Sequence, residues 1–137
     1  MEQSVRDAMA IAKASYDRCS ASPDFISAFY ARFFELRPEA KQLFAKTDFE
    51  KQHKLLRHAI GLLINFPGQP ETEPNILAWA ARRHSRRELG IDGSHYPPFL
   101  ESLIDTVRRF DPEFTPAIEA AWRATLAPGF AYMQSKY

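Results

Sequence analysis

Short segments with helical periodicity, separated by prolines and helix-capping residues, divide the chain and constrain its fold most strongly. Apolar residues recur every three or four positions on one face, as at Val5, Ala8, Ala12 and Tyr16. No segment alternates between apolar and polar residues for long enough to form a strand. The sequence therefore predicts an all-α fold of seven to eight helices.

Capping residues and prolines set the expected helix boundaries. Ser22 and Pro23 form a start signal, with the serine as cap and the proline at the first helical position. Thr47 and Glu50 have the spacing of a capping box. We expect Gly90 to end its helix as a left-handed cap. The helices predicted in this way cover residues 5–19, 23–36, 38–44, 48–65, 75–90, 97–110 and 115 onward, with a proline-rich loop at 67–74.

Composition fits one domain over residues 1–137, because 45% apolar residues in a 15.7 kDa chain can form a single core. A net charge of +1 gives no electrostatic footprint for nucleic acid. The longest apolar run, residues 59–64, is too short to cross a bilayer, and from the N-terminal residues we expect no signal peptide. The lone Cys19 suits a reducing cytoplasm. We expect a cytoplasmic protein without nucleic-acid or membrane partners, either a monomer or a homodimer.

The candidate site centres on His84, near the end of an amphipathic helix. Phe44 and Leu56 have spacings that would line an apolar slot facing it, and Tyr30 and Gln52 would place two polar groups on the far wall. A neutral imidazole is a common iron ligand, and a single axial histidine leaves the opposite position open for a diatomic gas. This combination of residues is what a haem iron needs.

His53 competes with Gln52 for the far wall. The residues expected to share the slot face of the 48–65 helix are Phe49, Gln52, Leu56, Ala59, Ile60 and Leu63. His53 and Arg57 lie one residue around from that face. If His53 faced the slot, Arg57 would be buried without a visible partner, at a cost of several kcal/mol by rough estimate. We therefore predict Gln52 as the polar residue of the slot.

From residue 25 to residue 122, the sequence resembles a bacterial single-domain globin, of the type that also forms the haem domain of flavohaemoglobins. The matching segments occur in the expected order and spacing. They are residues 29–38, 43–44, 52–56, 81–84, 90–91, 95–96 and 121–122. The resemblance implies a globin fold around a haem b group, iron protoporphyrin IX.

On the proximal side of the haem, the resemblance makes His84 similar to the iron ligand and Tyr96 similar to a tyrosine at the start of the penultimate helix. Ile91 belongs to the same pattern, and Arg83 is the first candidate to pair with a haem propionate. On the distal side, Tyr30 and Gln52 match the distal tyrosine and glutamine.

Two apolar residues complete the implied haem contacts. Phe44 matches the phenylalanine that stacks on the porphyrin edge, and Leu56 matches the apolar neighbour of the gas. We read His58 and His95 as solvated or hydrogen-bonded histidines without a role in the site.

A phenol and an amide on the distal wall would favour dioxygen over the less polarised carbon monoxide. Dioxygen on a ferrous haem carries partial negative charge, and a hydrogen bond to a charged acceptor is worth about 1.5–3 kcal/mol.

One departure from the flavohaemoglobin pattern concerns the proximal side of the haem. Where flavohaemoglobins carry a glutamate that hydrogen-bonds the proximal histidine, this chain has Tyr137, so the resemblance does not extend to a peroxidase-like electronic push.

Three function classes remain open from the sequence. The first is reversible binding of dioxygen for storage or delivery. The second is nitric oxide dioxygenase activity, which would need a separate reductase because the chain carries no flavin or nicotinamide domain. The third is a gas-sensing or interaction module. The partners expected are therefore dioxygen, with nitric oxide and carbon monoxide as further ligands.

Overall fold

Helices make up the regular structure of the computed structural model, which describes residues 3–44, 46–68, 75–89 and 91–137. The α-helices are α1 (Gln3–Ser20), α2 (Phe25–Leu36), α3 (Phe49–Asn65), α4 (Ala78–His84), α5 (Tyr96–Phe110) and α6 (Pro116–Ser135). Three short 3-10 helices lie between them: η1 (Pro38–Phe44), η2 (Phe66–Gly68) and η3 (Gly93–His95). No strand occurs in these ranges, so the all-α prediction is confirmed.

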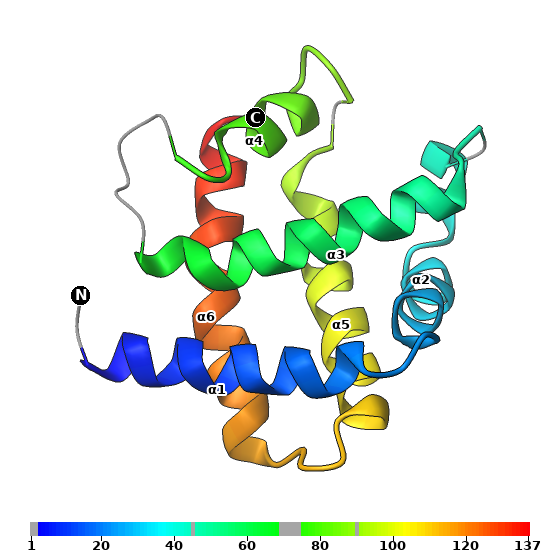
Figure 1. Ribbon diagram of the computed structural model, residues 1–137. Helices are drawn as coiled ribbons and strands as arrows, with labels where there is room; N and C mark the ends of the chain where they lie inside the picture. Colours follow the sequence, from blue (N-terminus) through cyan, green and yellow to red (C-terminus); the bar gives the residue numbers. More distant parts are fainter. Residues whose placement is uncertain (1–2, 45, 69–74, 90) are drawn as a thin grey trace.

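The helices cross one another in two directions (Figure 1). α1 and α3 run roughly alongside each other, and α5 and α6 run across them. α1 packs mainly on α6, and α2 packs mainly on α5. The short α4 lies beside the C-terminal end of α6 (Figure 1). Within the described ranges, no helix combines the length and apolar character needed to cross a membrane.

A buried polar cluster joins α1, α5 and α6 at the base of the core. Trp122, which is fully buried, donates a hydrogen bond of 2.9 Å from Nε1 to Ser15 Oγ. Ser15 in turn donates to Asp111 Oδ2 at 2.6 Å, and Arg18 donates to both oxygens of the same carboxylate at 2.7 and 2.9 Å. Burial alone would raise the pKa of Asp111, but the hydrogen bonds from Arg18 and Ser15 lower it to about 2.

Close packing of α6 against α3 depends on a glycine. A Cβ atom at Gly129 would lie 2.7 Å from Leu63 Cδ2 and 3.1 Å from Leu77 Cδ1. Both leucines are buried, so neither side chain has free space to move into. Gly129 therefore sets how near α6 comes to α3 and to the residue before α4.

Two predicted helix caps are wrong by one or two residues. α2 begins at Phe25 with Asp24 as its N-cap, so Pro23 is not helical, and Ser22 Oγ only accepts a hydrogen bond from the Asp24 backbone. α3 is capped by Asp48, whose side chain accepts from the backbone N–H groups of residues 50 and 51. Asp48 thus replaces Thr47 of the predicted capping box, because a carboxylate in the capping position satisfies the same free N–H groups.

The helix that carries His84 is shorter than predicted. α4 begins at Ala78 rather than near Asn75, whose side chain accepts from the Leu77 N–H at 2.9 Å. It ends at His84, and residues 85–89 form turns instead of continuing the helix. The predicted cap, Gly90, lies outside the described residues, as do residues 69–74 of the predicted loop. The predicted cap of the last helix is confirmed, since Thr115 Oγ1 accepts from the Ile118 N–H.

Candidate functional site

His84 is the last residue of α4, and its imidazole is fixed by the helix itself. Nδ1 lies 2.8 Å from the carbonyl oxygen of Ala80, one helical turn earlier. A carbonyl oxygen only accepts, so this contact makes Nδ1 the protonated nitrogen and leaves a lone pair on Nε2. Nε2 has no hydrogen-bond partner within the described ranges. Burial lowers the pKa of His84, which keeps the ring in the neutral form that a metal requires.

The chain that follows α4 folds back against its end. The N–H of Ile91 donates to the carbonyl oxygen of His84 at 3.0 Å, so the backbone of Ile91 is held beside the histidine. The Arg83 side chain is exposed and pairs with Glu88 at 3.3 Å. Arg83, which was predicted to bind a haem propionate, therefore already pairs with a carboxylate. Ion pairs on the surface are weak, so a propionate could replace Glu88.

Tyr30, on α2, is surrounded by aromatic rings. It is only 5% exposed. The rings with centroids within 5.5–5.8 Å of it are Phe29, Phe34, Phe44, Phe49 and His53. Packing on this many sides fixes the direction of the phenol, because rotation of the ring would displace several neighbours.

The Tyr30 hydroxyl and Gln52 lie within hydrogen-bond reach of each other. Burial raises the pKa of Tyr30 to about 12, and a side-chain hydrogen bond with Gln52 partly offsets this rise. The phenol consequently stays protonated at neutral pH and can donate a hydrogen bond. Gln52 is half-buried on α3, close to the solvent boundary of the site.

His53 lies nearer to the site than the sequence analysis placed it. Its ring stacks on that of Tyr30, with centroids 5.5 Å apart and planes 15° apart, and it is half-buried. Arg57 nevertheless remains exposed, so the predicted burial penalty does not arise. Gln52 and His53 are adjacent on α3, yet both contact Tyr30, because Gln52 bonds its hydroxyl and His53 stacks on its ring.

The remaining predicted residues occupy separate positions. Leu56 is 7% exposed on the buried face of α3, together with Ile60 and Leu63. Tyr96, 9% exposed, stacks on Phe130 with centroids 5.4 Å apart. Phe44 is half-buried at the end of η1 and contacts the Tyr30 ring edge-on.

An apolar groove of about 370 Å³ separates α3 from α4. Leu55 and Leu62 line it from α3, and Trp79 and Ala80 line it from α4. Ala80 is also the residue whose carbonyl holds His84, so the groove reaches the backbone that supports the imidazole. His84 itself does not line the groove.

The structure thus assembles two halves of the predicted site. Tyr30, Phe44 and Gln52 form one half on α2, η1 and α3. His84 and Ile91 form the other, at the end of α4. Sequence reasoning missed the contact between His53 and Tyr30, and it did not assign Ala80, although helical spacing places the carbonyl four residues before His84.

Comparison with known proteins identifies the fold. The family model described as Globin matches residues 27–133. The chain belongs to the globin family. Among solved structures, this globin is similar to a protein PA3967 from Pseudomonas aeruginosa PAO1, described as structurally highly homologous to a human hemoglobin. The two are 31% identical over 95% of this chain and 98% of that chain, with a TM-score of 0.88. No curated protein matches the chain.

Globins generally bind haem, and the residues of this globin fit such a group. In globins a proximal histidine holds the haem iron through a free nitrogen lone pair, and Nε2 of His84 offers such a lone pair. Haem also requires apolar surroundings, which the aromatic cluster around Tyr30 and the buried face of α3 supply.

Proposed function

We propose that this globin binds one haem b through Nε2 of His84 and binds dioxygen reversibly. The observation that carries the proposal is the state of the imidazole: Nδ1 is engaged by the Ala80 carbonyl at 2.8 Å, and Nε2 has no partner within the described ranges. Nε2 is not among the fully buried, unpaired polar atoms of the described residues, so its lone pair is accessible to an incoming metal.

Several residues would hold the haem. Phe44 and Leu56 offer apolar surface from η1 and α3, and Ile91 and Tyr96 offer it from the segment after α4 and the start of α5. Arg83 is the first candidate to bind a propionate, in exchange for its exposed pair with Glu88. When bound, the haem would supply a ferrous iron with one open coordination position for a gas.

Tyr30 and Gln52 would select and retain the gas. A protonated phenol and an amide are both donors, and a polarised ligand such as dioxygen accepts from them more strongly than carbon monoxide does. Each such bond contributes about 1.5–3 kcal/mol, and about 1.4 kcal/mol corresponds to a tenfold change in affinity. The aromatic rings around Tyr30 fix its donor in advance, which lowers the entropy lost on binding.

Absorption spectra of the purified protein test this proposal. The oxidised protein should show a Soret band, reduction by dithionite should shift it, and carbon monoxide should shift it again with a stoichiometry of one haem per chain. Exposure of the reduced protein to oxygen and then to vacuum should give a reversible change. A protein that shows no Soret band, even after haem is added, would contradict the proposal.

The alternative activity, nitric oxide dioxygenation, is tested on the same preparation. Consumption of nitric oxide at catalytic rates in the presence of oxygen and an added reductase would favour the enzyme. Stoichiometric consumption that ends after one turnover would favour the oxygen-binding role. The likeness to flavohaemoglobin haem domains is part of this proposal, and it depends on Tyr30 and Gln52 acting as the distal donors.

A further inference from the structure

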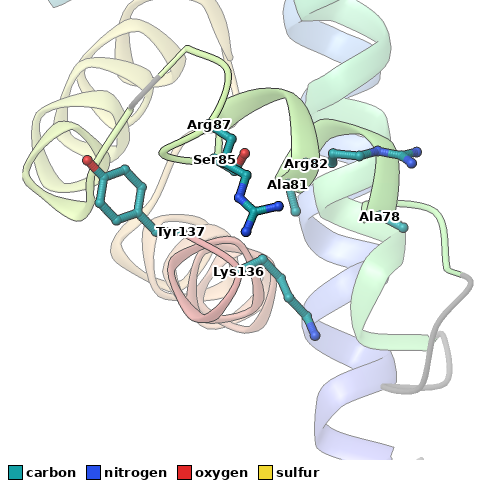
Figure 2. Close-up of a pocket in the computed structure, with 7 residues that line it drawn as sticks. All are labelled: Ala78, Ala81, Arg82, Ser85, Arg87, Lys136 and Tyr137. Carbon is teal, nitrogen blue, oxygen red and sulfur yellow. The ribbon is translucent and has the colours of Figure 1, made fainter.

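A second hollow, of about 610 Å³, lies between α4, the turn that follows it and the last residues of the chain (Figure 2). Its volume falls within the range of small-molecule sites, about 300–1,000 Å³. The residues that give it chemical character are Arg82, Ser85, Arg87, Lys136 and Tyr137. Three of them are cationic, and none of the described residues that line the hollow is acidic. The hollow therefore concentrates positive charge.

The chain has twelve arginines, and half of them are already paired with a carboxylate. Each arginine in the following set has a carboxylate oxygen within 4.0 Å: Arg18, Arg32, Arg37, Arg83, Arg108 and Arg123. Arg82 and Arg87 have no such partner within the described ranges. They are exposed and line the same hollow, so their guanidinium groups are available to a ligand.

Figure 2 shows the guanidinium of Arg87 between the turn and the end of α6, and the side chains of Arg82 and Lys136 extending from α4 and α6 away from it. A guanidinium presents its N–H groups as a fork that matches two oxygens of a phosphate, and the Ser85 hydroxyl can donate one more bond. We propose that this hollow binds a small polyanion that carries phosphate groups, with Arg82 and Arg87 as its main ligands. Three cations around one hollow suit a diphosphate better than a single carboxylate.

A polyanion bound in this hollow would affect His84, the proposed iron ligand, through the backbone. Residues 81, 82 and 85 of the hollow flank His84 on the same short stretch of chain. The turn is already tied to the end of the chain, because the Arg86 N–H donates to the Tyr137 carbonyl oxygen at 3.0 Å. A polyanion bridging Arg82 and Arg87 would restrain this stretch further. The effect on gas binding rests on the proposed function, whereas binding of the anion does not.

Titration calorimetry with pyrophosphate at low salt tests the site itself, on the protein as purified and on the haem-saturated protein. Pyrophosphate should bind with one site per chain, and rising salt should weaken it. The double variant Arg82→Gln/Arg87→Gln should lower the affinity at least tenfold. The matched control is Arg6→Gln/Lys13→Gln, which also removes two positive charges, from exposed positions on α1. Equal affinities in the control and the double variant, or no binding of pyrophosphate, would overturn the proposal.

The second arm measures coupling. Pyrophosphate should shift the gas affinity of the haem-saturated wild type and leave that of the double variant unchanged. Binding without any shift would keep the anion site and overturn its link to His84. Binding of acidic polypeptides such as polyglutamate, with pyrophosphate inactive, would assign the surface to a protein partner and overturn the small-molecule site. Failure of haem binding would leave the first arm intact, so the two proposals fail separately.

Discussion

Nδ1 of His84 lies 2.8 Å from the carbonyl oxygen of Ala80, within the same helix. The acceptor is a neutral amide oxygen rather than a carboxylate. The chain position where a flavohaemoglobin-like acid was expected is taken by Tyr137, whose ring lies under the guanidinium of Arg86 at 5.1 Å. The imidazole therefore has a mild hydrogen-bond acceptor, and this fixes its donor strength toward a metal.

The first prediction concerns that donor strength. In the ferrous, ligand-free protein, the iron–histidine stretch measured by resonance Raman spectroscopy should fall in the low, myoglobin-like range. A carboxylate acceptor would give the imidazole anionic character and raise the frequency. A high, peroxidase-like frequency would mean that an acid reaches His84 when haem is bound.

The second prediction concerns the distal donor. Tyr30→Phe removes the hydroxyl and keeps the packing of the ring, so the oxygen off-rate should rise about tenfold or more. The rate is measured by stopped-flow displacement of oxygen with carbon monoxide. Tyr16→Phe is the matched control, because it removes a phenol that donates to the Arg57 carbonyl, away from the site. A similar off-rate in both variants would refute the role of Tyr30.

The third prediction separates the two neighbours of Tyr30 on α3. Gln52→Leu removes an amide that hydrogen-bonds the phenol, so it should raise the oxygen off-rate in the same direction as Tyr30→Phe. His53→Ala removes a stacked ring, worth about 0.5–1.5 kcal/mol for an aromatic pair, and should have the smaller effect. The same displacement assay ranks them. If His53→Ala gave the larger change, the distal donor would be His53.

The fourth prediction concerns stability and pH. The pKa of Asp111 is lowered to about 2 in the folded protein, so its carboxylate stabilises the fold above the ordinary aspartate pKa and loses this effect as pH falls toward about 2. A shift of this size corresponds to about 2 kcal/mol. Asp111→Asn should therefore lower the free energy of unfolding at pH 7, and its difference from wild type should narrow below about pH 4. Urea unfolding at both pH values measures this, and a constant difference would contradict it.

Helical periodicity was sufficient to predict the all-α class, because the longer helices each bury one face, whereas the globin fold was expected from the resemblance. On α3, for example, Leu56, Ile60 and Leu63 are buried, as their spacing indicates. The end of α4 was not predictable in the same way. The turn after His84 is held by the hydrogen bond from Arg86 to Tyr137, about fifty residues away in sequence, and local patterns carry no information on such a contact.

The site was predictable in part. Spacing placed Tyr30 near Gln52 because both lie on faces directed toward the same space. The position of His53 was missed, since a helical face indicates direction and does not indicate how far a long side chain reaches across to a neighbouring helix. His53 was predicted to lie off the slot because Arg57 was expected to be buried with it, but Arg57 is exposed.

The central claim is that Nε2 of His84 is the iron ligand, and His84→Gly tests it most directly. The variant removes the imidazole and leaves a space that free imidazole can fill. We expect the purified variant to lose its Soret band and to regain it when imidazole is added together with haem, while the matched variant His58→Gly on α3 keeps the wild-type spectrum. A wild-type spectrum in His84→Gly without added imidazole would contradict the account.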